Sequence, residues 1–300
     1  MTLLAFLESI RTPLGERICL LLTGLGTEYA FMAVALFVLW CVDRRWGFRM
    51  FPLYFAGMVG SEVGKSLLKT PRPFVRDPGL HPVPAALETA EGYSCPSGHS
   101  FSAGAIFFGA ATFFRRWWVR LLLALPVLLT MFSRMYLGVH TLTDVLVGAG
   151  LALALTVGFT FLYRWIDRRG KGDGWVYGIL LIVSAVATLV TVTHWFGGSE
   201  GAANAPKLLG CSAGLFAAWF LDARRGAPAM PNGWVSKLTC YVPGMAVCLG
   251  LLKGLKALFG LIVPDLWVLH AVRYGLVILA AATGWPWIWQ KAGSKFRKSH

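Results

Sequence analysis

Residues 143–164, TDVLVGAGLALALTVGFTFLYR, carry charges only at Asp144 and Arg164, close to the two ends of the stretch. A helix of about 20 such residues is long enough to cross the hydrocarbon layer of a membrane. Comparable stretches recur along the chain, at 27–42, 49–69, 99–114, 118–137, 143–164, 174–195, 205–222, 234–258 and 266–289. The sequence therefore predicts an all-α, polytopic membrane helix bundle with about nine transmembrane helices.

The composition supports lipid as the solvent of this chain. Of its 300 residues, 56% are hydrophobic and 14% charged, and the mean hydropathy is +0.62. Soluble proteins carry about 25% charged residues. The net charge of +14 does not indicate a nucleic-acid partner, because the basic residues lie in short turns between apolar stretches. We expect membrane lipids as the surroundings and no nucleic acid as a partner.

Basic residues also predict which way the chain is oriented. They cluster in the linkers after alternate spans: Arg44, Arg45 and Arg49; Arg115, Arg116 and Arg120; Arg168, Arg169 and Lys171; Arg224 and Arg225; and Lys291, Lys295, Arg297 and Lys298. The intervening segments, such as 196–206 and the turn at Pro264 and Asp265, are nearly free of Lys and Arg. The positive-inside rule then places the C-terminal tail in the cytoplasm and the N-terminus outside.

Three regions follow from this pattern. Residues 1–26 mix apolar and charged positions, which favours an interfacial helix region, although a first short span is an alternative. They lack the pattern of a cleaved signal peptide. Residues 27–170 hold the polar motifs, and 171–300 add further C-terminal spans and a basic tail. The polar stretch 70–98 must be a loop outside the membrane, on the outer side.

Chemically active side chains are concentrated in three blocks. The hydropathy pattern predicts that all three lie at the same outer face of the membrane. The first is Lys65 with Arg72 and Pro73, the second is Pro96-Ser97-Gly98-His99, and the third is Ser133-Arg134 followed by His140 and Asp144. If the second span continued as a helix, Lys65 and Arg72 would lie two turns apart on one side and grip one anion. Ser97 as an N-cap and Gly98 would form a phosphate seat that places His99 beside the phosphate.

The third block has the spacing of a nucleophile with its orienting partner. His140 and Asp144 are four residues apart at the start of the fifth span, so the carboxylate can fix the imidazole tautomer that leaves one nitrogen free to attack. Arg134 can donate a pair of hydrogen bonds to phosphate oxygens. Two histidines, a carboxylate and three cations suit phosphoryl transfer through a phosphohistidine, with His99 as acid and then base. We expect no metal or other cofactor.

The blocks KSLLKTPRP (65–73), PSGH (96–99) and SRMYLGVHTLTD (133–144) resemble the three signature motifs of the type 2 phosphatidic acid phosphatase superfamily. That superfamily includes bacterial lipid phosphatases and glucose-6-phosphatase. The resemblance covers about residues 50–165 and implies a six-helix-type phosphatase core. It also implies site roles: Lys65, Arg72, Ser97, Gly98 and Arg134 bind phosphate, His140 is the nucleophile, Asp144 is its partner and His99 is the acid.

The leading hypothesis is a metal-independent phosphatase that acts at the outer, extracytoplasmic or lumenal, face on a lipid such as a polyprenyl diphosphate, a phosphatidic acid or phosphatidylglycerol phosphate. A glucose-6-phosphatase-like sugar phosphatase and a lipid phosphotransferase are alternatives that use the same site. A transporter or scaffold built on the last four spans is an alternative of another class. The sequence does not predict an oligomeric state.

Several polar residues have plainer interpretations. We expect Glu62 to pair with a cation, Lys69 and Arg76 to be interfacial, and His194 to be interfacial rather than catalytic. The charged residues of the last spans snorkel and pair, or line a polar cavity: Lys253, Lys256, His270 and Arg273. The six cysteines show neither metal spacing nor a disulfide pattern: Cys19, Cys41, Cys95, Cys211, Cys240 and Cys248.

Overall fold

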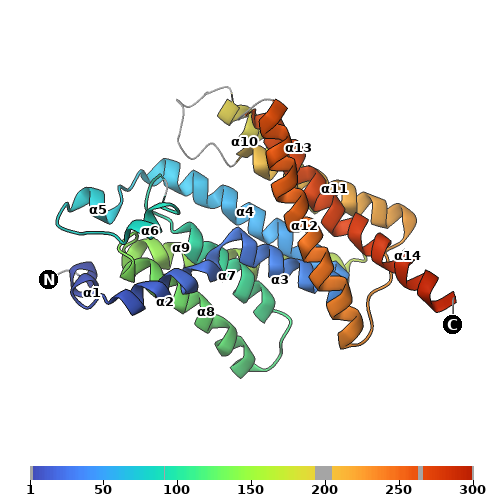
Figure 1. Ribbon diagram of the computed structural model, residues 1–300, viewed down its shortest axis with the longest axis horizontal. Coiled ribbons are helices and arrows are strands. Elements are labelled where there is room, and N and C mark those ends of the chain that lie inside the picture. Colours follow the sequence, from blue (N-terminus) through green and yellow to red (C-terminus); the bar gives the residue numbers. More distant parts are fainter. Residues whose placement is uncertain (1–2, 91, 193–204, 263–265, 299–300) are drawn as a thin grey trace. The chain divides into compact units, whose positions relative to one another are not determined.

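The structure, a computed structural model, describes residues 3–90, 92–192, 205–262 and 266–298 (Figure 1). Within these ranges the chain forms helices joined by turns and loops, without a strand, which confirms the all-α prediction. The elements are α1 Leu3–Ser9, α2 Pro13–Thr23, the 3₁₀ turn η1 Gly24–Gly26, α3 Glu28–Cys41, α4 Arg44–Leu68, α5 Pro73–Arg76, α6 Pro84–Leu87, α7 Gly98–Ala111, α8 Trp117–Tyr136, α9 Leu142–Arg168, α10 Gly174–Val192, α11 Ala205–Arg225, α12 Trp234–Ile262, α13 Trp267–Leu279, the π-helical segment η3 Ala280–Gly284 and α14 Trp285–Lys298.

Eight of the nine predicted spans each fall on one of these helices, and 266–289 falls on α13, η3 and α14 together. Among the described residues, four helical segments are long and apolar enough to cross a membrane: Trp117–Tyr136, Leu142–Arg168, Trp234–Leu261 and Trp267–Ala292. Pro13–Gly26 and Glu28–Cys41 together would make a fifth span, bent by 50°. The count of nine stays a prediction, as does the interfacial position of residues 1–26. The predicted outer segment 196–206 lies largely outside the described residues, and so do His194, Pro264 and Asp265.

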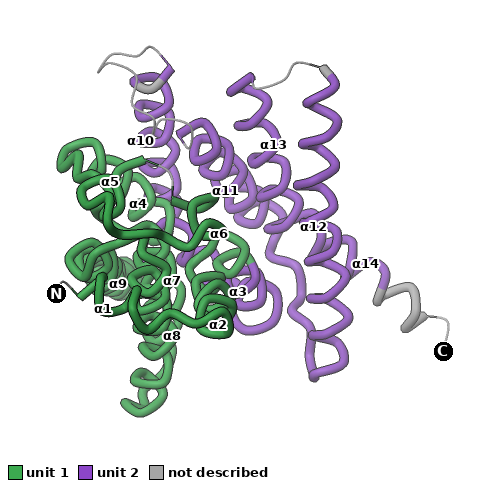
Figure 2. Tube along the Cα trace, turned by 60° about the vertical axis from the view of Figure 1, so that its left-hand side comes forward, with its two compact units in different colours: residues 1–32, 53–169 green, residues 33–52, 170–300 purple. Residues whose placement is uncertain are grey.

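The chain divides into two compact units (Figure 2). The first comprises Met1–Met32 with Leu53–Arg169, and the second comprises Ala33–Pro52 with Gly170–His300. The first unit contains all three motif blocks. The domain boundaries predicted at residues 26 and 170 remain predictions.

Small residues let the helices of the first unit pack closely around the motifs. A side chain at Gly104 of α7 would lie 2.5 Å from the Cβ of Ala152 in α9, and one at Gly57 would overlap the Phe101 ring. Between α8 and α9, apolar side chains form a buried cluster: Val127, Met131, Val145 and Ala149. This packing fixes the ends of α7, α8 and α9, where the motif residues lie.

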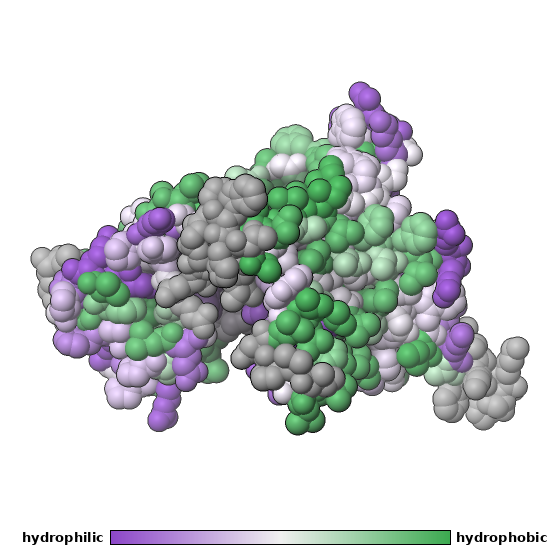
Figure 3. Space-filling model, turned by 90° about the horizontal axis from the view of Figure 1, so that it is seen from above, coloured by the Kyte–Doolittle hydropathy of each residue, from purple (hydrophilic) through white to green (hydrophobic). Residues whose placement is uncertain are grey.

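The other faces of α8 and α9 expose large apolar side chains at helical spacing. They include Leu121, Leu125, Leu128 and Phe132 on α8, and Leu146, Leu153, Val157 and Phe161 on α9. Figure 3 shows broad areas of apolar surface on the face it presents. Surface leucines in such numbers would promote aggregation in water but are the expected contact with lipid chains.

Buried ion pairs and close helix contacts hold the second unit together. Arg49 Nε donates to Asp173 Oδ2 at 2.8 Å, and Arg44 Nε to Asp222 Oδ2 at 2.7 Å. Gly214 of α11 lies against the carbonyl of Gly275 in α13. Arg273 is buried in α13 and contacts His270 Nδ1 at 3.4 Å, in keeping with the pairing interpretation. All six cysteines of the chain are buried and free.

Candidate active site

A capping box at the start of α9 places the third motif block. Thr141 is the N-cap: its side chain accepts from the Asp144 amide at 3.3 Å, while Asp144 Oδ2 accepts from the Thr141 amide at 2.7 Å. Because the helix begins at Leu142, His140 lies in the turn before the cap and not on the helix, in keeping with the predicted span of 143–164. The cap thus fixes the carboxylate, and the turn before it fixes the imidazole.

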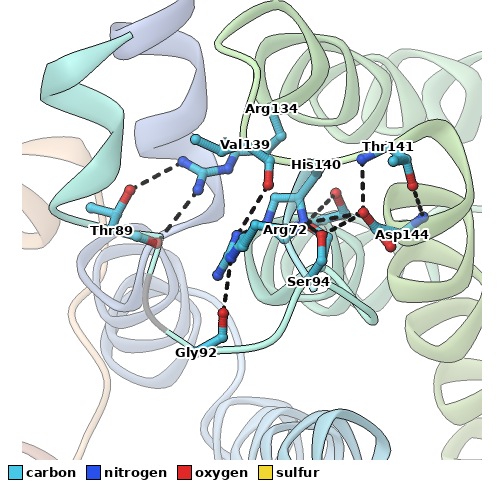
Figure 4. Close-up of polar contacts among 11 residues, drawn as sticks. Arg72, Thr89, Gly92, Ser94, Arg134, Val139, His140, Thr141 and Asp144 are labelled. Carbon is cyan, nitrogen blue, oxygen red and sulfur yellow. Dashed lines mark hydrogen bonds and ion pairs between the residues drawn. The ribbon is translucent and has the colours of Figure 1, made fainter. Parts of the chain in front are cut away.

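Ser94 lies beside both His140 and Asp144 (Figure 4). Ser94 Oγ donates to Asp144 Oδ2 at 2.6 Å and lies 3.4 Å from His140 Nδ1. Asp144 Oδ2 itself is 3.7 Å from His140 Nδ1, longer than a hydrogen bond. The pair expected from the i, i+4 spacing is therefore present at a distance longer than a hydrogen bond, and Ser94, a residue that sequence reasoning missed, lies within reach of both side chains.

Arg72 faces the opposite nitrogen of the same imidazole. Its Nη1 lies 3.0 Å from His140 Nε2 and donates to the Val139 carbonyl at 3.2 Å, while its Nε donates to the Gly92 carbonyl at 3.0 Å. Burial lowers the pKa of Arg72 to about 10, with Asp144 opposing the shift, so the guanidinium remains charged at neutral pH. A fixed cation therefore points at the nitrogen of His140 that Asp144 and Ser94 leave free.

Arg72 does not reach this place on an extension of α4. That helix ends at Leu68, and Lys69 adopts a φ of 45°, the left-handed conformation that terminates helices. Arg72 is the N-cap residue of the short helix α5, in extended conformation. The predicted two-turn alignment of Lys65 with Arg72 is therefore wrong, because the loop, not the helix, carries Arg72 to His140.

His140 is uncharged at neutral pH. Its side chain is 3% exposed, and burial first, then the charges of Arg134 and Arg72, lower its pKa to about 3 against the opposing influence of Asp144. With Arg72 donating to Nε2, the proton of the neutral ring belongs on Nδ1, on the side of Ser94. His140 thus presents an unprotonated Nε2 beside a cation.

Arg134 is fully buried and is held by two threonines. Its Nη1 donates to Thr23 Oγ1 at 3.2 Å and to Thr89 Oγ1 at 3.1 Å, and its Nη2 donates to the Thr89 carbonyl at 3.4 Å. Its Nε has no acceptor among the described residues. An unsatisfied, buried cationic donor is costly, and an anion in the site would supply the acceptor.

The second block forms the N-terminus of α7, and the prediction that Ser97 caps it is confirmed. Ser97 Oγ accepts from the Ser100 amide at 3.4 Å, and the Ser97 amide donates to the Asp144 carbonyl at 3.0 Å, which joins the starts of α7 and α9. A Cβ on Gly98 would meet no atom within 4 Å. The first amides of a helix lack acceptors within it, so this end suits an anion.

His99 and Lys65 are the remaining predicted site residues. Electrostatic interactions couple His99 to Arg134, His140, Arg72 and Lys65, although no hydrogen bond of the His99 ring is observed among the described residues. Lys65 Nζ pairs with Glu62 Oε1 at 3.2 Å, which confirms the expectation that Glu62 pairs with a cation. Lys65 is 18% exposed, so this pair lies where water or substrate can reach it.

Gly148 of α9 sets how closely the N-terminus of α7 approaches the site. A Cβ at Gly148 would lie 2.5 Å from the Ser97 carbonyl oxygen, whereas one at Gly150, in the same helix, would meet nothing within 4 Å. We expect Gly148→Ala to lower kcat at least 10-fold and to destabilise the protein by about 1–3 kcal/mol, because backbone must move. Gly150→Ala is the matched control. Equal activities of the two variants in a phosphate-release assay would contradict this account.

Within the part of the chain that the structure describes, no three His, Cys, Asp or Glu residues are grouped so as to hold a metal ion. The positive charge around the imidazole comes from Arg72 and Arg134. That the reaction needs no metal remains a prediction.

Comparison with known proteins places the chain in a family. Residues 46–171 match the family model described as the PAP2 superfamily. The chain belongs to the PAP2 superfamily and is an integral membrane phosphatase of it, as the three motif blocks predict. Residues 206–297 match a second model, described as the PAP2 superfamily phosphatase, transmembrane extension. The two matches together span more than two thirds of the chain.

Among curated proteins, none matches the chain. Among solved structures, the chain is similar to one described as the first transmembrane PAP2 type phosphatidylglycerolphosphate phosphatase from Bacillus subtilis. The two are 24% identical, the match covers 54% of this chain and 83% of that one, and the TM-score is 0.46.

Proposed function

We propose that the chain hydrolyses the phosphomonoester or diphosphate of a membrane lipid through a phosphohistidine on His140. The observation that carries the proposal is the 3.0 Å contact between Arg72 Nη1 and Nε2 of a buried, neutral His140. A phosphate that displaced this hydrogen bond and bound the guanidinium would lie in front of the attacking nitrogen. Proximity of this kind, with charge stabilisation, provides most of the catalysis in phosphoryl transfer.

The proposed reaction has two steps. First, the Nε2 lone pair of His140 forms a bond to phosphorus while the bond from phosphorus to the leaving oxygen breaks, and His99 gives that oxygen a proton. Then His99 takes a proton from water, whose oxygen attacks phosphorus and breaks the N–P bond. Arg72, Arg134, Lys65, the Ser97 hydroxyl and the Gly98 amide hold the phosphate oxygens throughout. An anion held there also favours the protonated form of His99.

A lipid substrate is supported by the surroundings of the site. The helices that carry the third block, α8 and α9, expose leucines toward the surrounding solvent, which for such helices is lipid. The basic linkers support an outer, extracytoplasmic or lumenal, site with the C-terminus in the cytoplasm. A polyprenyl diphosphate, a phosphatidic acid and phosphatidylglycerol phosphate are the candidate classes.

Phosphate release across a substrate panel tests this function. We expect purified protein in detergent or vesicles to release phosphate from at least one of these lipids at a kcat/KM about 100-fold or more above that for glucose 6-phosphate, because the apolar part of the lipid adds binding energy. Efficient hydrolysis of glucose 6-phosphate alone would favour the sugar phosphatase. A phosphorylated alcohol, formed when a lipid or sugar alcohol is added, would favour a phosphotransferase.

A further inference from the structure

We propose that Ser94 is a positioning residue that connects the carboxylate of Asp144 to the imidazole of His140. The proposal rests on the proposed function, since it concerns the nucleophile of that reaction. Ser94 lies outside the three motif blocks, in the loop that precedes α7. Its side chain is fully buried, and its amide donates to the Thr70 carbonyl at 2.8 Å, which holds it in place from the other end of the same loop.

Hydrogen-bond chemistry determines the direction of this connection. A serine hydroxyl has one proton to donate and lone pairs that accept. At 2.6 Å from Asp144 Oδ2, that proton is committed to the carboxylate, in a short bond to a charged acceptor. The Ser94 oxygen then has only lone pairs to offer His140 Nδ1, 3.4 Å away. The ring must therefore carry its proton on Nδ1.

Distances favour this route over direct contact. Asp144 Oδ2 already accepts from Ser94 at 2.6 Å and from the Thr141 amide at 2.7 Å, and it is 3.7 Å from Nδ1. Ser94 Oγ is therefore closer than the carboxylate to Nδ1, at 3.4 Å against 3.7 Å. When Nε2 takes the phosphoryl group, the ring becomes cationic with its Nδ1 proton in place. The Ser94 dipole, aligned by Asp144, stabilises that charge.

The test compares Ser94→Ala, Ser94→Cys and Ser94→Thr with the parent enzyme. We expect Ser94→Ala to slow single-turnover formation of the phosphoenzyme about 10- to 100-fold, the range for loss of a hydrogen bond to a charged group, with KM changed less than about 3-fold. Ser94→Cys keeps a side chain of similar volume, but its thiol is a weak hydrogen-bond donor and acceptor. We expect its phosphoenzyme to form several-fold more slowly than that of the parent. Ser94→Thr keeps the hydroxyl and recovers activity if its methyl is accommodated. Ser102→Ala removes another buried hydroxyl, near Tyr54, and should leave the rate unchanged.

A double mutant separates positioning from packing. If Ser94 acts through Asp144, adding Ser94→Ala to Asp144→Ala should cost less than about 3-fold further, because the acceptor of the Ser94 proton is already removed. Additive losses, or a Ser94→Cys enzyme as fast as the parent, would overturn the inference. The His140→Ala variant distinguishes failure of the Ser94 role from failure of the proposed function. An inactive His140→Ala protein beside a fully active Ser94→Ala protein refutes only the role of Ser94, whereas an active His140→Ala protein refutes the proposed function.

Discussion

His140→Ala is expected to lower kcat by about 10⁵-fold or more, the scale on which enzymes lose rate when a covalent nucleophile is removed. The buried ring is held on one side by Ser94 and on the other by Arg72, and no other imidazole has this arrangement in the described chain. Phosphate release from the best lipid of the panel, measured at saturating substrate, gives the effect on kcat directly.

His81→Ala is the matched control for this change. The His81 side chain is 78% exposed and pairs with Glu8 at 3.0 Å. We expect its kcat to stay within about 2-fold of the parent, as for most surface substitutions. Retention of even a hundredth of the parent kcat by His140→Ala would show that another group attacks phosphorus.

Arg72→Ala should lower kcat/KM by about 10³-fold, since removing one donor that stabilises transition-state charge costs about 10²–10³ in rate. The loss should appear in kcat more than in KM, because Arg72 also keeps Nε2 of His140 unprotonated. Arg72→Lys keeps the positive charge, but a lysine lacks the forked guanidinium that contacts the Gly92 carbonyl and His140 at the same time. We therefore expect it to recover only part of the lost kcat/KM. Steady-state kinetics of both variants measure these effects.

Arg76→Ala serves as the control for Arg72, because Arg76 ends the same short helix and is exposed. Its kcat/KM should stay within about 3-fold of the parent. Salt dependence helps to separate the two arginines, since screening weakens an exposed charge more than a buried one. If Arg72→Lys were as active as the parent, the forked geometry of Arg72 would be unnecessary and this part of the account would be wrong.

Local spacing predicted the parts of the site that lie near helix starts. Ser97 precedes an apolar helix, which is the pattern of an N-cap, and it is one. The four-residue spacing of His140 and Asp144 predicted that they would be neighbours, and they are, at 3.7 Å. Such relations depend on a few adjacent residues and are therefore visible in the sequence.

Contacts made by distant segments were not predictable in this way. Ser94 is 50 residues from Asp144, and Thr23 is 111 residues from Arg134. No fixed spacing links these pairs, because loop closure and helix packing bring them together. Arg72 shows the same limit: its motif spacing suggested a helix, but the helix ends at Leu68 and the loop positions the guanidinium.

For the fold, too, local features were predictable from the sequence and long-range contacts were not. Long apolar stretches mark helices directly, so the positions of α8, α9 and α12 followed from hydropathy. The role of α2 did not, because its apolar residues are interrupted by Glu16 and Arg17 and gave no sign that Thr23 would hold Arg134. The N-terminal helices are therefore part of the site's support as well as candidates for the interface.

Trapping the phosphoenzyme tests the central claim most directly. Protein mixed with a ³²P-labelled lipid substrate and quenched in alkali within one turnover should carry acid-labile, alkali-stable label, and peptide mass spectrometry should locate it on His140. Asp144→Asn should accumulate less label because it forms more slowly, and His140→Ala should carry none. Turnover with no labelled protein at any quench time, or label on another residue, would contradict the account.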